Sequence, residues 1–267
     1  MRKGSRFLVG TGVVLLVLLP MVGSAMVSAP SRVSPVLGPP FRISGPSRQV
    51  RPDLAWNATA GEYLVVWEDR RDFAASDWEI YGRRVGADGS LLGADVSISG
   101  GADPSWEFGP AVACNQTDGS YLVVWSGGHA RVVAADGTPQ GTSSLGGAWQ
   151  NPRVAWNSVD NEYLVVWPTY DGVFGQRLTA AGALAGGSQV ISSSADVWAE
   201  SAAVVWNATD EEYFVVWDSR WSDPGVFGRR VSAAGSPLGN DVVLTGPNPV
   251  SSSPFWADVA WSGAAGE

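Results

Sequence analysis

The segment Val154 to Trp167 reads Val-Ala-Trp-Asn-Ser-Val-Asp-Asn-Glu-Tyr-Leu-Val-Val-Trp. Close copies of it begin at Leu54, Val112 and Val204, and the residues from Val259 onward repeat its first half. The asparagine of each copy, or its serine counterpart, marks equivalent positions 58, 42, 50 and 55 residues apart: Asn57, Asn115, Asn157, Asn207 and Ser262. Repeats of this length are too long for leucine-rich or paired-helix units, and they indicate small sheets.

The second half of the segment predicts a strand with two apolar sides. Tyr163 to Trp167 form an unbroken run of aromatic and β-branched residues. Side chains alternate along a strand, so Tyr163, Val165 and Trp167 point to one side. Leu164 and Val166 point to the other. A sheet built from such strands must therefore be covered on both faces.

Each repeat contains signals for four strands. A hairpin turn rich in Asn joins the first strand to the second, and third strands are expected over residues 79–85, 172–178 and 225–231. Turns of the form Ala-x-Gly follow, and fourth strands are expected over residues 95–99 and 241–245. No convincing helical period occurs after residue 25. The sequence predicts an all-β fold, a β-propeller of four-stranded antiparallel blades.

The propeller is expected over residues 37–267 and is incomplete in this chain. The sequence holds four full blades and the first strand of a fifth, and it stops where a second strand should follow, so we interpret it as C-terminally truncated. Residues 37–45 match residues 92–100, which form a fourth strand. We expect this N-terminal strand to close the ring by completing a blade whose other strands lie elsewhere in the chain.

The N-terminus is typical of a secreted protein. Residues 1–25 have a basic start, an apolar run and a small-residue cleavage site, which predicts a signal peptide; an uncleaved anchor is the alternative. Residues 26–36 are interpreted as a linker. We expect a secreted, extracellular or cell-surface protein without a membrane span after cleavage, and a propeller that is monomeric within a longer chain.

Charge and cysteine content narrow the possible partners. The net charge of −9 becomes about −12 without the signal peptide, which contains the lysine Lys3. An acidic, lysine-free surface makes nucleic acid and anionic membranes unsuitable partners. Cys114 occupies the position of a repeat tryptophan, so it is expected to be a buried packing residue.

The two rims of the blades differ in sequence. One rim carries short turns that are alike in every repeat. Asn57, Asn115 and Asn207 lie in these turns and also begin glycosylation-acceptor triplets, but we expect them to be turn residues. Glu62, Glu162 and Glu212 lie on the same rim. We expect the third-strand arginines, Arg84, Arg177 and Arg230, to pair with a neighbouring acid.

The other rim has variable loops, and it is the predicted binding surface. Aromatic rings stack on sugar faces while carboxylates and guanidinium groups bind hydroxyls or an acidic sugar. The alternative is that the connection tryptophans pack between blades and that the charges are merely solvated. The candidate ligand-binding residues are Trp106, Trp149, Trp198, Trp256, Asp69, Arg70, Asp77, Trp78, Tyr170, Asp171, Arg220, Trp221 and Asp223.

No catalytic or metal-binding motif is present in the sequence. His129 has no Cys or His partner at ligand spacing, and the sequence contains no phosphate loop, nucleophile elbow or zinc-protease motif. We therefore expect no cofactor and no metal. A glycosidase needs two carboxylates, for which Glu68, Asp69, Asp72 and Asp77 are candidates.

The repeat pattern Glu-Tyr-Leu-Val-Val-Trp followed by Ile-Tyr-Gly-Arg-Arg-Val resembles the repeats of secreted bacterial β-propeller proteins. This resemblance implies an extracellular recognition or scaffold module. Three functions remain open: a non-catalytic module that binds a glycan or a protein partner, a glycoside hydrolase or lyase of sialidase-like propeller architecture, and a structural scaffold. A sialidase Ser-x-Asp-x-Gly-x-x-Trp box is absent from the sequence.

Overall fold

The computed structural model describes residues 40–71, 78–100, 107–144, 149–193, 199–219, 225–245 and 257–261. The chain divides into two units, Met1–Phe41 and Arg42–Glu267. Pro40 and Phe41 are the described residues of the first unit, and both are exposed. Every strand described below belongs to the second unit. The expected signal peptide and linker, residues 1–36, lie outside the described ranges.

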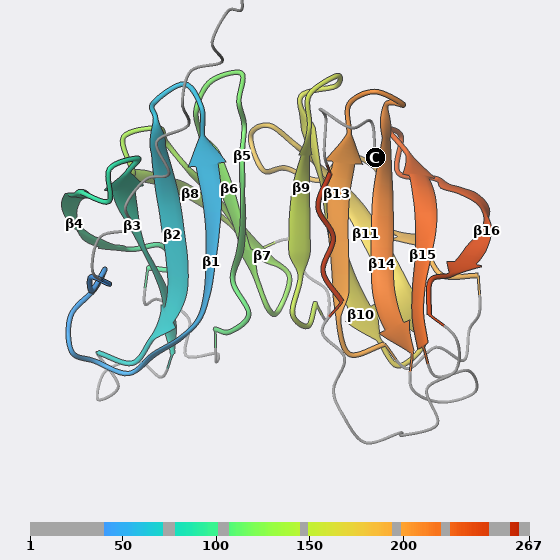
Figure 1. Ribbon diagram of the computed structural model, residues 1–267, viewed down its shortest axis with the longest axis horizontal. Coiled ribbons are helices and arrows are strands. Elements are labelled where there is room, and N and C mark those ends of the chain that lie inside the picture. The colour runs from blue at the N-terminus through green and yellow to red at the C-terminus, as the bar shows by residue number, and fades with distance from the viewer. Residues whose placement is uncertain are drawn as a thin grey trace, which may run out of the picture. The chain divides into compact units, whose positions relative to one another are not determined.

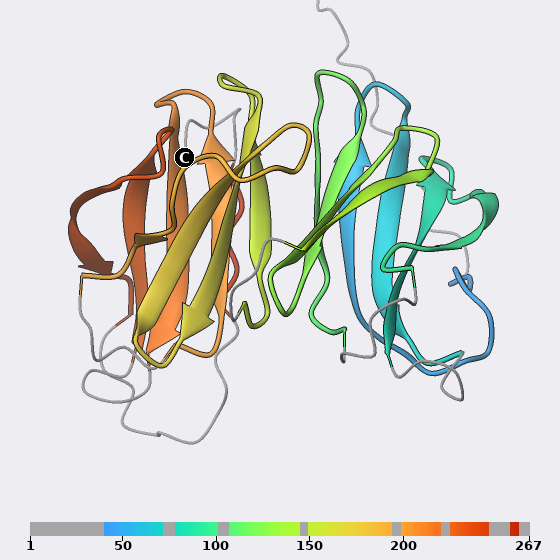
Figure 2. The same cartoon turned by 180° about the vertical axis from the view of Figure 1, so that it is seen from behind.

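The described strands form four antiparallel sheets of four strands each, in which sequence neighbours are spatial neighbours (Figures 1 and 2). Blade 1 contains β1 (Gln49–Asn57), β2 (Glu62–Asp69), β3 (Glu79–Gly86) and β4 (Leu91–Ser97). Blade 2 contains β5 (Ala111–Cys114), β6 (Tyr121–Trp125), β7 (His129–Val133) and β8 (Pro139–Ser144). Blade 3 contains β9 (Arg153–Asn157), β10 (Glu162–Thr169), β11 (Gly172–Thr179) and β12 (Gln189–Val190). Blade 4 contains β13 (Ala202–Asn207), β14 (Glu212–Ser219), β15 (Gly225–Ser232) and β16 (Pro237–Val243).

This architecture confirms the expected all-β fold of four-stranded blades. The described residues contain no helix, and therefore none long and apolar enough to cross a membrane. The first strands lie next to one another from blade to blade, with β1 beside β5, β5 beside β9 and β9 beside β13. First strands are thus innermost and fourth strands outermost, as in a propeller.

Asparagine side chains build the turn between the first and second strands. In blade 1, Asn57 Oδ1 accepts hydrogen bonds from the backbone N–H groups of Thr59 and Ala60, both at 3.0 Å. The Asn57 amide also donates to the carbonyl of Gly119 in blade 2 at 2.8 Å. Gly61, four residues after the asparagine, has a left-handed φ of 68° that glycine adopts without strain. The predicted turn role of the asparagines is confirmed.

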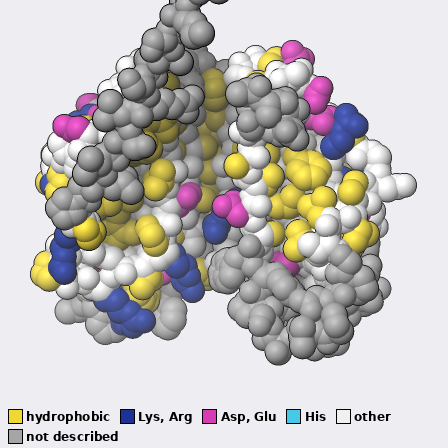
Figure 3. Space-filling model, in the orientation of Figure 1, with side chains coloured by type: hydrophobic (Ala, Val, Ile, Leu, Met, Phe, Trp, Pro, Cys, Tyr) yellow, Lys and Arg dark blue, Asp and Glu magenta, His cyan; other side chains and the backbone are white. Residues whose placement is uncertain are grey.

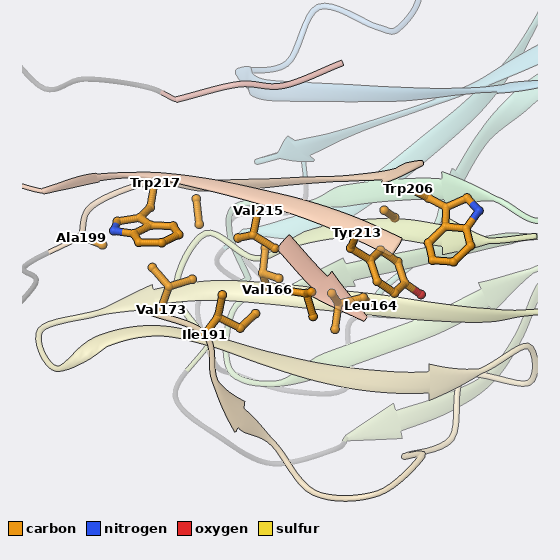
Figure 4. Packing of buried hydrophobic residues seen from close by; sticks show 12 residues of the cluster. Leu164, Val166, Val173, Ile191, Ala199, Trp206, Tyr213, Val215 and Trp217 are labelled. Atoms are coloured by element: carbon orange, nitrogen blue, oxygen red, sulfur yellow. The ribbon is translucent and has the colours of Figure 1, made fainter. Parts of the chain in front are cut away.

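The apolar core lies between the blades and uses both sides of each second strand. On the back face of blade 3, Tyr163, Val165 and Trp167 are buried against blade 2. On its front face, Leu164 and Val166 are buried against blade 4. Figure 4 shows front-face residues of blade 3 meeting back-face residues of blade 4, including Tyr213, Val215 and Trp217. The predicted need for cover on both faces is therefore met by neighbouring blades.

Paired charges cross between the second and third strands, as predicted. Arg84 Nη1 lies 3.2 Å from a Glu62 carboxylate oxygen, and Arg177 Nη1 lies 2.7 Å from Glu162. In blade 4, the Arg230 guanidinium pairs with the Glu212 carboxylate. The recurring arginines thus hold the sheets together and do not form a ligand-binding ring.

The outer segments differ in part from the sequence prediction. Residues 42–45 contact blade 1 but are not a strand, and residues 257–261 are not a strand either. A strand requires a partner with which to exchange backbone hydrogen bonds, and neither segment has a paired strand among the described residues. The fourth strands also begin earlier than expected, because pairing starts directly after the turn that ends β3 and β15.

We expect Leu164→Ala to lower the free energy of unfolding by about 2–5 kcal/mol, because it removes a buried side chain from the interface between blades 3 and 4. Val159→Ala is the matched control, since Val159 is exposed in the neighbouring turn, and its effect should stay within about 0.5 kcal/mol. Urea unfolding monitored by tryptophan fluorescence measures both. Equal effects of the two changes would contradict packing between blades.

We also expect no glycan at Asn57, Asn115 or Asn207 when the chain is secreted from a glycosylating host behind a standard leader. These side chains are buried and serve the turns, so the folded protein does not present them. Intact-mass measurement before and after treatment with a glycan-removing amidase checks this. A mass loss on treatment would show that the acceptor triplets are used.

Candidate functional site

The rim where second strands end and third strands begin is called the loop rim here. In Figure 1 the loop rim of blade 1 is the lower edge, at the arrowhead of β2. Its described residues in blade 1 are the last residues of β2, the two arginines that follow them, and Trp78, which precedes β3. Ser47 and Arg48, which precede β1, and Gln49, its first residue, lie at the same edge.

Asp69 organises the loop rim of blade 1. Its buried carboxylate accepts hydrogen bonds from Arg71 Nη2 at 2.6 Å, Trp67 Nε1 at 2.9 Å and the Ser47 hydroxyl at 2.9 Å. Burial by itself raises the pKa of a carboxyl group, but these donors outweigh it and lower the pKa of Asp69 to about 2. Asp69 is therefore an ionised anchor that fixes the surrounding loop.

Arg71 connects this anchor to the outer strand. Its guanidinium bonds both Asp69 and Asp95, the latter at 2.7 Å, and its carbon Cζ lies 4.1 Å from the ring centroid of Tyr81. Arg83 also pairs with Asp95, at 3.3 Å. Both carboxylates are thus used by arginines within blade 1.

Trp78 lies beside two more guanidinium groups. The Cζ atom of Arg70 is 4.8 Å from the Trp78 ring centroid, and that of Arg48 is 5.6 Å from it. The backbone N–H of Arg70 donates to the carbonyl of Arg48 at 3.2 Å, which joins the two segments. Basic side chains gather at this lower edge in Figure 3. We call Arg48, Arg70 and Trp78 the Arg–Trp cluster. It holds two cationic side chains beside an indole ring on a protein whose net charge is negative.

In blades 1 and 4 the residue after the second-strand tryptophan is an acid that holds the connection to the neighbouring blade. Glu68 is buried and accepts hydrogen bonds from Arg51 Nη1 at 2.8 Å and from the backbone N–H of Gly109 at 2.7 Å. Asp218 is also buried, and its Oδ1 accepts from the Ser201 N–H at 2.7 Å and the Ser201 hydroxyl at 3.0 Å. These carboxylates stabilise the loop rim and are not presented to solvent.

Three charged residues occupy equivalent positions of the repeat, two on first strands and one in residues 257–261. They are Asp53, Arg153 and Asp258, where blades 2 and 4 have alanine. Asp53 Oδ2 accepts a hydrogen bond from the N–H of Val112 at 2.9 Å. Burial raises the pKa of Asp53, and the Asp258 carboxylate adds to the rise. Figure 3 shows acidic and basic side chains meeting in the middle of this view, between β5 and β9.

Some of the predicted ligand-binding residues lie close together in the structure, whereas one of them is buried. Arg70 and Trp78 lie in the Arg–Trp cluster, with Asp69 beneath them as its support. Trp149 is 3% exposed and stacks on Trp167 with ring centroids 5.1 Å apart. Its rings are covered by blades 2 and 3, so Trp149 packs between blades, as the alternative interpretation expected.

Two predicted residues lie on the loop rim of blade 3. Tyr170 is 67% exposed and Asp171 is also exposed, in the tight turn between β10 and β11. The hydroxyl of Thr169 accepts from the Asp171 N–H at 3.1 Å, which fixes the turn. The remaining predicted residues lie outside the described ranges, as does the candidate acid Asp72: Trp106, Trp198, Trp256, Asp77, Arg220, Trp221 and Asp223.

Sequence reasoning missed Arg48 and Asp53. Arg48 precedes the first strand of the repeat, and nothing in its neighbourhood of Ser, Gln and Val indicates a contact with Trp78, thirty residues later. Asp53 did offer a signal. It lies at the same repeat position as Arg153 and Asp258. Charged residues are rarely fully buried, so this recurrence indicates a first-strand position that is not part of the apolar core.

The two remaining reactive side chains have packing roles. Cys114 is buried in the cluster between blades 1 and 2, and burial raises the pKa of its thiol to about 12, which confirms the expected packing role. His129 stacks on Trp125, with ring centroids 5.5 Å apart. Over the described ranges, no group of three or more His, Cys, Asp or Glu side chains has the geometry to hold a metal ion.

Comparisons with known proteins support the fold and leave the activity open. Neither the protein-family models nor the curated proteins match the sequence. Among solved structures, hydrazine synthase of Kuenenia stuttgartiensis has a TM-score of 0.51 at 10% identity, covering 72% of this chain and 48% of that one. An exo-β-1,3-galactanase of Phanerochaete chrysosporium, an E208A variant with β-1,3-galactotriose, scores 0.50 at 14% identity over 72% and 49%.

A nidogen/laminin complex shows a weaker likeness, with a TM-score of 0.48, 16% identity, and coverage of 78% of this chain and 68% of that chain. This chain thus spans about half the length of the hydrazine synthase and galactanase chains that it matches. At these identities the similarity shows a β-propeller fold alone. The similarity therefore does not select among the functions considered above.

We expect Asp69→Asn to lower the free energy of unfolding at pH 7 by about 2 kcal/mol, from a pKa shift of nearly two units. Because the folded pKa lies below the ordinary value of 3.8, the stabilisation is complete above about pH 5 and is lost as pH falls towards 2. The difference in free energy of unfolding between the native chain and the variant should therefore decrease as the pH falls from 5 to 2. Denaturant unfolding at pH 7, 4, 3 and 2 measures it.

Asp171→Asn is the control, since this exposed carboxylate belongs to the same rim in blade 3. Its unfolding curve should follow that of the native chain at every pH. A constant gap between the native chain and the Asp69→Asn variant from pH 7 to pH 2 would contradict the anchoring role of the ionised carboxylate.

Proposed function

We propose that this chain is a non-catalytic recognition module that binds an acidic glycan at the loop rim of blade 1. The observation that carries the proposal is the Arg–Trp cluster, in which the Arg48 and Arg70 guanidinium groups lie within 5.6 Å and 4.8 Å of the Trp78 ring centroid. Carboxylate or sulfate groups on a sugar pair with the N–H edges of such guanidinium groups.

The support beneath the cluster favours binding at low entropic cost. Asp69 holds the backbone N–H of Arg71 at 2.8 Å and the hydroxyl of Ser47 at 2.9 Å, so both segments that carry the cluster are fixed to one buried carboxylate. A rigid site loses less conformational freedom on binding than a mobile one. The described acids near the cluster, Asp69 and Asp95, pair with Arg71 and Arg83 within the blade.

The expected location agrees with such a ligand. We propose that the protein is secreted, because the sequence begins with a predicted signal peptide, and acidic polysaccharides are outside the cell where such a module acts. An acidic segment of an extracellular protein has the same charge but lacks a sugar face for the indole ring. We therefore place the glycan first and the protein partner second.

Trp78→Ala and Arg48→Gln are each expected to weaken binding to an acidic polysaccharide at least tenfold, measured by titration calorimetry with a polyuronate and a matched neutral glucan. Binding of the native chain should fall as salt rises, because the contact is ionic and exposed. Arg230→Gln is the control, since this 61% exposed arginine lies on the opposite rim and should leave affinity unchanged.

Each other result has a defined meaning for the proposal. Equal affinity for the polyuronate and the neutral glucan would show that the arginines do not contribute to binding. Binding only to an acidic peptide would assign the rim to a protein partner. If no ligand binds and the variants change stability alone, the chain is a structural scaffold.

A glycoside hydrolase is the second candidate, and Asp53 is the observation that favours it. A general acid needs a raised pKa and a second carboxylate nearby, and burial together with Asp258 raises the pKa of Asp53. Glu68 and Asp69 fit the role poorly because both are buried in hydrogen bonds. Release of reducing sugar that is lost in Asp53→Asn and kept in Trp78→Ala would establish this function in place of the first.

A further inference from the structure

Within the described ranges, no residues cover the front face of blade 4 in the way that the front faces of blades 1 and 3 are covered. Ile98, Ile191 and Leu244 are equivalent, because the N–H of each donates to the second residue of the third strand in its own blade, at 2.7, 2.7 and 2.9 Å. Ile98 is 1% exposed and Ile191 is fully buried, whereas Leu244 is 46% exposed. Val242 is exposed on the same strand.

The internal interfaces show what covers such a face. Ile191 belongs to the same buried cluster as Tyr213, Val215 and Trp217, the back-face residues of the next second strand (Figure 4). Ile98 packs against the corresponding Tyr, Val and Trp of blade 2. Both interfaces thus pair a front face with a Tyr-x-Val-x-Trp strand. The open face of blade 4 has the geometry to receive the same kind of strand.

A hydrogen bond that recurs at two junctions fixes the third strand of the covering blade. Arg229 Nη1 donates to the carbonyl of Ile191 at 2.8 Å, and Arg131 makes the equivalent bond to the carbonyl of Ile98. Each of these arginines follows the glycine, or its counterpart, of the third strand. The equivalent acceptor on blade 4 is the carbonyl of Leu244.

Two short segments already occupy a first-strand position and a fourth-strand position beside the described blades. The N–H of Ala257 donates to the hydroxyl of Ser201 at 3.0 Å, which places residues 257–261 next to the start of β13, where a following first strand belongs. The carbonyl of Ile43 accepts from Arg83 Nη1 at 2.9 Å, as those of Ile98 and Ile191 do from their arginines. Residues 42–45 therefore stand on blade 1 as a preceding fourth strand would.

Neither segment is paired with another strand in the described part of the chain. One lies where a first strand belongs and the other where a fourth strand belongs. The positions between them correspond to a second and a third strand. We propose that the front face of blade 4 and these two segments bind one β-hairpin that carries a second and a third strand of this same repeat.

The chemistry of the hairpin follows from the internal interfaces. Its first strand presents Tyr, Val and Trp side chains to Phe214, Val226 and Leu244 of blade 4. Its second strand carries an arginine that reaches the Leu244 carbonyl, and its outer edge pairs with residues 42–45. The association is directional and apolar, unlike binding at the loop rim, and it does not depend on the proposed glycan.

The test uses the full chain and a labelled synthetic peptide of residues 162–179, which spans β10, its tight turn and β11. This peptide has Gln176 where blades 1, 2 and 4 have the bonding arginine, so a Gln176→Arg peptide is made in parallel. Fluorescence anisotropy should show saturable binding of both peptides, tighter for the arginine form. Trp167→Ala in the peptide should weaken binding at least tenfold.

Leu244→Glu in the full chain should also weaken binding at least tenfold, while Leu184→Glu, at a leucine with the same exposure elsewhere in the chain, should not. Circular dichroism checks that both variants fold. As a second readout, a full chain with a linked extra copy of residues 162–179 should have a higher Tm, and Leu244→Glu should cancel the gain.

Three results would overturn the proposal. They are equal peptide binding by the native chain and the Leu244→Glu variant, absence of both peptide binding and a Tm gain, and a dimer of the native chain that Leu244→Glu dissociates. The last result assigns the face to a second copy of the chain.

Discussion

The structure depends on one constraint, which is that every blade is apolar on both faces. A single sheet of this kind would leave Tyr163, Val165 and Trp167 in water on one side and Leu164 and Val166 on the other. Each apolar face is stable only when it contacts another sheet, because burial of these side chains is the main favourable term in folding. The polar groups that this packing buries then need hydrogen-bond or ion-pair partners. Buried asparagines satisfy the turns, Glu–Arg pairs join the second and third strands, and Glu68 and Asp218 hold the connections.

The sequence predicts well whatever is decided within one repeat. The alternation of Tyr, Val and Trp with Leu and Val specifies both faces of the second strand, and the positions of Glu162 and Arg177 place them opposite one another across β10 and β11. The same holds for Asn57, whose turn role follows from its own neighbours. In each case the interacting groups are within about twenty residues, so local spacing is sufficient.

Features that arise between repeats are harder to predict. Trp149 is in a connection of variable length, and only its contact with Trp167 shows that it is buried. The Arg–Trp cluster needs the segment before β1 to lie beside the residue before β3, which is set by the hydrogen bonds of Asp69. The electrostatic influence of Asp258 on Asp53 links residues that are far apart in the sequence. These contacts depend on the relative positions of whole blades. The pattern of residues within one repeat does not specify those positions.

The front-to-back contact between blades has a consequence for how this architecture can change during evolution. A face that fits the back of its neighbour does not fit a copy of itself, so the contact is heterologous and has a direction. Duplication of one repeat inserts a unit that matches both of its new neighbours without any new side chain. Each junction depends only on the two blades that form it. The number of units that fit in the array is then determined by the angle between successive blades. Lineages can therefore gain or lose whole units while the front-face and back-face residues of each junction remain unchanged.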